Sequence, residues 1–345
     1  MRFVCPECGN TSCVEAAERV IKAAPTLYAK CPSCNDLILD KTEEIDLTSI
    51  RFDSSRCEGC GKRPLDVVMA HILASSVQNK KCPGLALRQV GTPLLSPSVP
   101  IYARPQIGYK NLLLLTDQPI IAAASDRILR DVREVKGVIY GNAAEPFGLA
   151  YKEAAARTCR TLAGCDMRAD LVTSAYGQLL IYKSQSKIHI EHDHSRKIAK
   201  LSVLPIADHA VFDALAGPGT LGLTCVLMGA KKVTLNDAWF PAVENTYLNL
   251  HVNRRVLGIQ SISRVSRATK ARAATVSGGS SYLFATAKTH RARIKLYHGA
   301  FEEFDIEASG TQIILVDPFP GTEAHFEALI EDIHRKYPRI HVICV

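Results

Sequence analysis

The chain has 345 residues and a formal net charge of +8, and 47% of its residues are hydrophobic, 22% charged and 6% aromatic. This composition argues against a disordered chain, and the length favours two or three domains. No run of 18 uncharged apolar residues occurs, and the N-terminus lacks an apolar stretch of signal-peptide length. We therefore expect a cytoplasmic protein without a membrane segment.

The N-terminal region contains cysteine pairs with the spacing of metal ligands. The pairs are Cys5 and Cys8, Cys31 and Cys34, and Cys57 and Cys60. We expect the first two pairs to bind one structural zinc, because two such knuckles supply the four thiolates of a closed tetrahedral site. The third pair would need two more ligands to form a second site, and the nearest candidates are His71 and Cys82, with Cys13 in reserve.

The same cysteine pairs fit two other chemistries. They could be the reactive dithiols of a redox protein, but three pairs within 60 residues and no thioredoxin-like βαβ pattern around them disfavour this interpretation. An iron–sulfur cluster stays open, because thiolates bind iron as well as zinc. Any such metal would be structural, since four cysteines leave no open position for a substrate.

Residues 1–90 are therefore expected to form a zinc-ribbon-like metal-binding region. The proline-rich link "GTPLLSPSVPIYARP" follows and marks a boundary, because it cannot hold regular structure for long. Residues 91–168 are predicted to form a small α/β module. Its expected strands are "NLLLLTD" and "KGVIYG", and its expected helices are "SDRILRDVREV" and "EAAARTCRTLAG".

Residues 169–208 are predicted to contain antiparallel strands and a linking helix. The segment "DLVTSAYGQLLIYKSQSKIHIEHD" alternates in polarity and breaks at Gly177, which is typical of a hairpin. Three histidines, His189, His192 and His194, invite a metal interpretation. In an extended chain the first would face away from the other two, so we interpret them as exposed strand residues.

Residues 209–345 alternate between strand and helix patterns. The expected strands are "AVFDAL", "KKVTLND", "RIKLYHG", "TQIILVD" and "RIHVICV", and the expected helices are "TLGLTCVLMGA", "PAVENTYLNLHVNRRVLG" and "TEAHFEALIEDIHRKY". Alternation of this kind predicts an α/β fold with a parallel, doubly wound, Rossmann-like sheet. Ligands bind at the carboxyl ends of the strands in such sheets.

Three acidic or glycine-rich motifs fall at that edge. "GPGTLG" places Gly217 and Gly219 between the first strand and its helix, and the acidic Asp237 ends the second strand. These features alone fit a nicotinamide dinucleotide equally well. Asp213 inside the first strand and Asp317 at the end of a later strand, in "VDPFPG", decide against that ligand, because a buried carboxylate there suits the cationic end of a charged ligand.

The segment from 254 to 301 is strongly basic. It contains ten Lys or Arg and no Asp or Glu. Its Ser-, Thr- and Gly-rich centre predicts a long flexible excursion whose cations neutralise phosphates, with Tyr282 and Phe284 placed to stack on bases. The alternative interpretation is a solvated loop without a partner.

These motifs together resemble those of class I S-adenosylmethionine-dependent methyltransferases over residues 209–345. "VFDALAGPGTLGL" is similar to their first motif, and "DPFP" to the fourth motif of the amino-methylating branch. "NDAWFPAVENTYLNLHVN" and "VDPFPG" resemble tRNA guanine-N2 methyltransferases, whereas "KIHIEHDHSRKIAKLSVLP" is more similar to archaeal tRNA guanine-N1 methyltransferases.

The resemblance implies roles for individual residues. Gly217 and Gly219 would approach the methionine part of the cofactor, Asp213 would help to hold its ammonium group, and Asp237 would accept the ribose hydroxyls. The backbone at Ala300 would hold the adenine. The expected catalytic residues are Asp317, Pro318 and Phe319. Two helix residues, Asn249 and Asn253, also match the family pattern, and for them a structural role is as well supported as a substrate contact.

Asp317 and the Pro318 carbonyl are expected to accept N–H bonds from an exocyclic amine, and Phe319 to stack on its base. The chain departs from the family pattern where "YHGAFEEF" lacks the acidic residue expected for adenine. It also ends at the fifth strand, so we expect the strands of 170–193 or a second subunit to cover that sheet edge.

The sequence as a whole predicts a methyltransferase that acts on a guanine amino group in tRNA or another RNA. The expected partners are S-adenosylmethionine, two structural zinc ions, RNA bound by residues 254–301 and the metal ribbons, and a second copy of the chain. Two alternatives stay open. One is a methyltransferase of a protein or small molecule, and the other is a non-catalytic RNA-binding protein on a degenerate methyltransferase fold.

Overall fold

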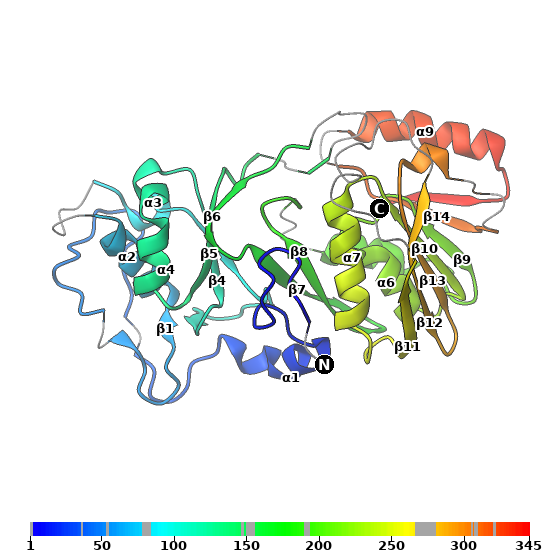
Figure 1. The fold of residues 1–345 in the computed structure, drawn as a ribbon. Coiled ribbons are helices and arrows are strands. Elements are labelled where there is room, and N and C mark those ends of the chain that lie inside the picture. The colour runs from blue at the N-terminus through cyan, green and yellow to red at the C-terminus, as the bar shows by residue number, and fades with distance from the viewer. Residues whose placement is uncertain are drawn as a thin grey trace. The chain divides into compact units, whose positions relative to one another are not determined.

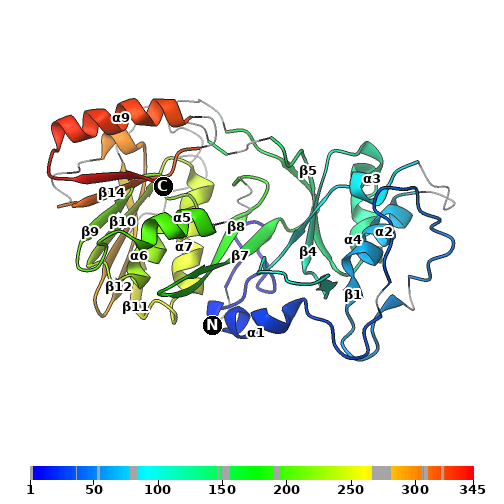
Figure 2. The same ribbon diagram turned by 180° about the vertical axis from the view of Figure 1, so that it is seen from behind.

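The computed structural model describes residues 3–35, 37–52, 55–77, 84–145, 148–149, 156–189, 194–265, 281–304, 306, 310–319 and 322–345. The chain divides into two compact units. Unit 1 comprises residues 1–21, 146–158 and 171–345, and unit 2 comprises residues 22–145 and 159–170. Figure 1 shows the elements of both units, and Figure 2 shows them from behind.

Unit 1 contains a seven-stranded sheet in the order β11-β12-β13-β10-β9-β14-β15. The strands are β9 (Ala210–Asp213), β10 (Lys232–Asp237), β11 (Ile259–Arg264), β12 (Tyr282–Thr289), β13 (Arg293–His298), β14 (Ile313–Val316) and β15 (His341–Cys344). The five strands from β13 to β15 are parallel, whereas β11 and β12 add to β13 in antiparallel fashion. The chain order of the parallel strands is that of the predicted doubly wound sheet.

Helices cover both faces of this sheet. The helices of unit 1 are α5 (Ser195–Ser202), α6 (Thr220–Leu227), α7 (Phe240–Val252) and α9 (Glu323–Lys336), with a short 3-10 helix at Phe301–Glu303. One apolar cluster lies between the sheet and α6 and α7, and includes Val211, Val233 and Leu296. A second cluster on the opposite face joins Phe212 and Val316 to α9. Alternate residues of the same strands thus serve two cores, as in an α/β sandwich.

A hairpin of β7 (Met167–Ser174) and β8 (Gly177–Ser184) forms a separate two-stranded sheet. Within the described part of the chain it pairs with no strand of the large sheet, and β15 is hydrogen-bonded only to β14. The expectation that residues 170–193 cover the sheet edge at β15 is therefore wrong for the described residues. The physical reason is that β8 is bound by side chains of α7 instead, as described below.

Unit 2 is built around a four-stranded sheet in the order β2-β4-β5-β6. Its strands are β1 (Arg63–Pro64), β2 (Thr92–Leu95), β3 (Gln106–Ile107), β4 (Leu112–Thr116), β5 (Val135–Tyr140) and β6 (Arg160–Gly164), and its helices are α2 (Leu65–Ser76), η3 (Leu87–Gln89), α3 (Pro119–Ala123) and α4 (Ser125–Asp131). Helix α1 (Ala17–Leu27) contains residues of both units. The apolar run of β4 is buried throughout, as a central strand requires.

The structure divides the N-terminal half differently from the predicted boundaries. One core cluster joins Leu73 of α2 to Leu114 of β4 and Ile128 of α4, so the predicted boundary near residue 90 lies inside a shared core. The expected helix "EAAARTCRTLAG" is also wrong in its described part. Residues 160–164 form β6, because hydrogen bonds to the edge of β5 outweigh the local helix propensity.

Candidate cofactor and catalytic site

The turn between β9 and α6 has a backbone that only glycine adopts readily. Gly217 has φ +53° and Gly219 has φ +88°, both in the left-handed region. At Gly222, inside α6, an added Cβ would lie 2.1 Å from the Leu235 side chain, so glycine is needed for close contact between the helix and β10. The turn delivers the chain to the N-terminus of α6 at the carboxyl edge of the sheet, where ligands of such sheets bind.

Asp237, the last residue of β10, holds this turn from the neighbouring strand. Its Oδ2 accepts a hydrogen bond of 2.7 Å from the Gly217 N–H, and its Oδ1 accepts one of 2.7 Å from the Trp239 N–H. Burial raises the pKa of this carboxyl to about 6. A carboxylate has about four acceptor positions, so two of them stay available for donors of a ligand such as ribose hydroxyls.

Asp213, the last residue of β9, is a fully buried carboxyl group. Its Oδ2 accepts a hydrogen bond of 2.8 Å from the Gly222 N–H, whereas its Oδ1 is buried without a hydrogen-bond partner among the described residues. Burial raises its pKa to about 8, and the charges of Asp317 and Asp237 add to the rise. An unsatisfied buried oxygen at this edge fits a cationic donor that a ligand would bring.

The end of β13 lies beside Asp237, because His298 is the register partner of that residue. The His298 Nδ1 lies 2.9 Å from the Tyr282 hydroxyl, and its Nε2 lies 3.0 Å from the Ala238 carbonyl. Burial lowers the pKa of this histidine, so the ring is neutral at neutral pH. Both ring nitrogens are engaged within the protein, and the Ala300 carbonyl accepts a 3.0 Å hydrogen bond from the Ser281 hydroxyl.

Asp317 follows β14 directly, and its carboxylate forms an ion pair with a lysine of α5. The Lys197 Nζ lies 2.9 Å from the Asp317 Oδ2, and both side chains are only partly exposed. Asp317 was predicted to lie at a strand end, whereas Lys197 was not predicted as a site residue. The only signal for that residue was a short basic segment, "SRK", which by itself is typical of a solvated helix face.

The ring of Phe319 lies in contact with segments from two other parts of unit 1. The centroids of Phe319 and His189 are 6.3 Å apart with the rings tilted. A Cβ added at Gly148, whose φ is +136°, would lie 2.9 Å from the Phe319 ring, so that glycine allows the close approach. His189, predicted to be an exposed strand residue, is half-buried and lies near the candidate catalytic segment. His192 lies outside the described residues, as does the second proline of "DPFP".

Two buried asparagines of α7 and a third at its C-cap bind the backbone of β8. The pairs are Asn245 with Ser184, Asn249 with Tyr182, and Asn253 with Leu180. In the central pair, Asn249 accepts a 2.8 Å hydrogen bond from the Tyr182 N–H and donates one of 2.8 Å to the Tyr182 carbonyl. The residues that the resemblance left open between a structural and a substrate-binding role therefore have a structural one.

Helix α7 also contacts the glycine turn. The Asn249 Nδ2 donates a second hydrogen bond, of 2.8 Å, to the Pro218 carbonyl. The Thr246 hydroxyl donates one of 2.8 Å to the Gly217 carbonyl. One helix therefore fixes both the turn that would hold a cofactor and the strand that leads to His189.

The cysteines form two groups, and their composition corrects the predicted pairing. Four sulfur atoms of unit 2 lie within 4.8 Å of one another. They belong to Cys31, Cys34, Cys57 and Cys60. Neighbouring sulfurs are 3.4 Å to 3.7 Å apart, close to the roughly 3.8 Å that four thiolates adopt around a tetrahedral zinc with bonds of about 2.3 Å. Hydrogen bonding from the Cys60 backbone helps to lower the pKa of the Cys57 thiol to about 7, whereas burial raises the pKa of the Cys34 thiol to about 12. A metal would bind both as thiolates.

Cys5 and Cys8 lie in unit 1, where their sulfurs fall within 4.8 Å of that of Cys13. They were predicted to share a metal with Cys31 and Cys34. The first and third pairs share the sequence Cys-x-x-Cys-Gly, whereas the second pair lacks the glycine, so the four-cysteine group combines one pair of each type. Gly9 and Gly61 both have positive φ and donate their N–H groups to the first cysteine's carbonyl.

The other candidates for the second metal site are placed elsewhere or are not described. His71 stacks on Phe52 at a centroid distance of 4.5 Å, and its Nδ1 accepts a 3.1 Å hydrogen bond from the Arg63 guanidinium. Burial, followed by the Arg63 charge, lowers its pKa to about 4. The structure therefore gives His71 a packing role, and Cys82 lies outside the described residues.

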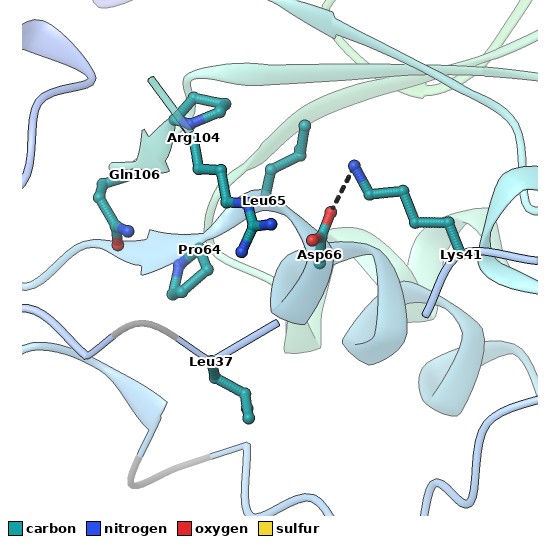
Figure 3. Close-up of a pocket in the computed structure, with 8 residues that line it drawn as sticks. Leu37, Lys41, Pro64, Leu65, Asp66, Arg104 and Gln106 are labelled. Carbon is teal, nitrogen blue, oxygen red and sulfur yellow. Dashed lines mark ion pairs between the residues drawn. The ribbon is translucent and has the colours of Figure 1, made fainter. Parts of the chain in front are cut away.

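Unit 2 also has a small pocket, drawn in Figure 3. It lies beside β1 and α2, where the Lys41 Nζ forms a 3.1 Å ion pair with Asp66, and Arg104 and Gln106 contribute further lining atoms. Its volume of about 40 Å³ holds one or two water molecules, so a nucleoside does not fit. It contains none of the predicted site residues.

No family model and no curated protein sequence matches the chain. Among solved structures it is similar to Trm5b from Pyrococcus abyssi, with 12% identity over 66% of this chain and 55% of that chain and a TM-score of 0.38. It is also similar to Pyrococcus horikoshii TYW2 in complex with MeSAdo, with 18% identity over 59% of this chain and 58% of that chain and a TM-score of 0.35. It is similar as well to Trm1 from Pyrococcus horikoshii with S-adenosyl-L-methionine, with 19% identity over 43% of this chain and 36% of that chain and a TM-score of 0.31.

The chain spans little more than half the length of the first two of these structures. Within the described part of the chain, every helix is too short or too polar to cross a membrane.

The contacts of Asn249 give a prediction about the structure of unit 1. Replacing Asn249 with alanine leaves two polar groups of Tyr182 and the Pro218 carbonyl without their partner. Each such loss in a buried site costs about 1 to 3 kcal/mol, so we expect a clear fall in urea resistance. Amide hydrogen exchange should accelerate first at Tyr182. Replacing the exposed Asn142 with alanine is the control and should leave exchange in β8 unchanged.

Proposed function

We propose that the protein is an S-adenosylmethionine-dependent methyltransferase that methylates an exocyclic amine of guanine in tRNA or another RNA. The observation that carries this proposal is the set of three carboxylates around a glycine turn at one sheet edge, Asp213, Asp237 and Asp317. They are close enough for Asp317 and Asp237 to raise the pKa of Asp213. A site for a nicotinamide dinucleotide requires neither Asp213 nor Asp317.

The residues of the edge fit the cofactor part by part. Gly217 and Gly219 allow a close backbone approach, and the two remaining acceptor positions of Asp237 suit a pair of ribose hydroxyls. The unsatisfied Oδ1 of Asp213 suits an ammonium group, directly or through a water. The ring of His298 is hydrogen-bonded within the protein, so backbone groups near Ala300 would hold the adenine.

When bound, S-adenosylmethionine supplies a methyl group on a positively charged sulfur. The chain's own residues then have to orient the nitrogen that receives it. The Asp317 carboxylate and the Pro318 carbonyl would each accept an N–H bond of the amine, which turns its lone pair away from the ring system. Phe319 would stack on the base, and Lys197 keeps the carboxylate in place. The nitrogen becomes acidic as it is alkylated, and Asp317 would accept its proton.

We further propose that the two cysteine groups bind structural zinc. The four thiolates of Cys31, Cys34, Cys57 and Cys60 make one complete site. The three cysteines of unit 1 need one more ligand, which replacement of the remaining cysteines one at a time would identify. The basic residues between 254 and 301 would supply the RNA contacts.

The catalytic role of Asp317 gives the principal test. Asp317→Ala should lower turnover by about 10²-fold, the usual effect of removing one preorganised group from a transition state, while cofactor affinity changes little. The measurement is methyl transfer to RNA from cells that lack the gene, followed by mass spectrometry of nucleosides. Asp208→Ala, which removes a carboxylate that is 77% exposed, is the control and should stay active. Nearly full activity of the Asp317→Ala enzyme would refute the proposed chemistry.

Asp213 gives a prediction about proton release. Its pKa of about 8 keeps the carboxyl group largely neutral at pH 7 in the free protein. An ammonium group beside it favours the ionised form and lowers that pKa, so cofactor binding at pH 7 should release a proton. Affinity should therefore increase as the pH rises toward 8. Calorimetry at pH 7 in buffers of different ionisation enthalpy measures the released protons.

One variant makes this prediction specific. Asp213→Asn cannot ionise, so proton release should disappear together with part of the affinity. In the absence of cofactor, this carboxyl group has a pKa of 3.8 in the unfolded chain and about 8 in the folded protein. Its contribution to the free energy of unfolding is therefore fully present below about pH 4 and is lost as the pH rises through 8. The Asn variant should therefore lose less stability than the parent protein between pH 4 and 8. Proton release that is equal in both proteins would reject the ammonium assignment.

The metal proposal has its own test. The protein purified without chelator should carry about two zinc ions, and Cys31→Ser should remove about one of them and loosen unit 2. Elemental analysis gives the count, and limited proteolysis the loosening. Cys344→Ser, at an exposed cysteine outside both groups, is the matched control. A parent protein without metal would contradict the assignment.

A further inference from the structure

Part of one face of the unit 1 sheet is polar and basic. In β10, β12 and β13 the apolar residues Val233, Ala287 and Ile294 face the core with α6 and α7. Residues one position along these strands point to the opposite face. Those residues of four adjacent strands are Lys232 and Thr234, Arg293 and Lys295, Thr286 and Lys288, and Ser261 and Ser263. Thr234 is buried, and we name the other seven residues, which are exposed or partly exposed, the basic face.

The strand register places the cations of the basic face side by side. Arg293 is the register partner of Lys232 on one side and of Lys288 on the other. These three side chains form a row across three strands, about 10 Å wide at a strand spacing of about 4.8 Å. Lys295 lies two residues further along β13 and points the same way. The four positive charges therefore form one patch, although Lys232 lies more than 50 residues away from the others in the sequence.

The patch contains no acidic residue. The one carboxylate in these four strands is Asp237, which lies on the other face and holds the glycine turn. Among the described residues, no ion pair includes Lys288, Arg293 or Lys295. Burial, followed by the Lys295 charge, lowers the pKa of Lys232, so the crowding of like charges is felt within the patch.

Solvation alone does not account for this arrangement. A sheet face exposed to water needs polar residues, but these residues need not all carry the same sign of charge. Like charges opposite each other on neighbouring strands are destabilising.

The apolar cluster under α9 covers the other half of this face, at Phe212, Ile314 and Val316. Toward the carboxyl ends of the strands the patch is followed by Tyr297, whose ring packs against Phe304 at a centroid distance of 5.1 Å.

We propose that the basic face binds the phosphodiester backbone of the RNA substrate. This inference rests on the proposed function and assigns a surface to its substrate. Cations in a row neutralise successive phosphates, and the neighbouring hydroxyls of Ser261, Ser263 and Thr286 donate hydrogen bonds to phosphate oxygens. Lys295 is three residues before the end of β13, or about 10 Å at 3.3 Å per residue. A few nucleotides span that distance to the carboxyl edge where the base would react.

The test uses the full-length protein with Lys288, Arg293 and Lys295 replaced together by glutamine. The probe is a labelled single-stranded RNA of mixed sequence, and its affinity is measured over a range of salt concentrations. Each phosphate contact contributes about 0.7 to the slope of log affinity against log salt for a single strand. We expect the slope to fall by about 2 and the affinity at low salt to fall at least 10-fold.

A matched variant separates the patch from net charge. Replacing Arg335, Lys336 and Arg339 by glutamine removes the same charge from exposed positions at the end of α9 and beyond it. It should keep the parent affinity within about twofold. Equal losses in both variants, or no loss in the first while its thermal unfolding is unchanged, would overturn the proposal. Binding to phosphatidylserine vesicles that depends on the patch while RNA binding does not would also overturn it.

Calorimetric titration with S-adenosylmethionine distinguishes this inference from the proposed function. Both triple variants should bind the cofactor as the parent protein does, because none of the six residues lies at the carboxyl edge of the sheet. Unchanged cofactor binding with unchanged RNA binding would reject the surface and leave the methyltransferase intact. RNA binding through the patch in a protein that binds no cofactor would support the surface and reject the methyltransferase.

Discussion

The hydrogen bonds between the asparagines of α7 and the backbone of β8 are the contacts on which the rest of unit 1 depends. Residues four apart on a helix lie about 6.0 Å apart along its axis, and alternate residues of a strand lie about 6.7 Å apart. The two periods match closely enough for Asn245, Asn249 and Asn253 to reach alternate residues of one strand. The asparagine side chains thereby supply the hydrogen bonds that a neighbouring strand would otherwise supply to β8. The buried backbone groups of β8 thus have partners.

The same helix determines the geometry of the candidate site. Asn249 and Thr246 bind the carbonyls of Pro218 and Gly217, and Asp237 binds the turn from the other side. Backbone groups held in this way need no reorganisation when a ligand arrives, which reduces the cost of binding. It also explains why Asn249 stays fully buried although it lies next to the turn, because its amide is already used three times within the protein.

The sequence predicted the parallel sheet well because its strands are short apolar runs that end in carboxylates, as in β9 and β14. It predicted the three cysteine pairs but not which of them share a group, since the choice of partners depends on chain packing that spacing does not encode. Strand β12 was missed because Ala, Thr and Lys alternate within a basic segment that is typical of a loop. Lys197 and His189 were missed for a related reason, as each becomes meaningful only beside Asp317 or Phe319.

The three carboxylates at the sheet edge differ in their surroundings, and this difference separates their roles. Asp237 is satisfied by two backbone N–H groups, and Asp317 has a lysine at 2.9 Å. Asp213 has neither a cation nor a second hydrogen bond among the described residues, so its charge is the one that the fold disfavours most. A positively charged ligand would relieve that cost and so favour its own binding. Asp317 keeps its acceptor oxygens beside a protein cation, and under the proposed function an entering amine would meet an acceptor that is already oriented.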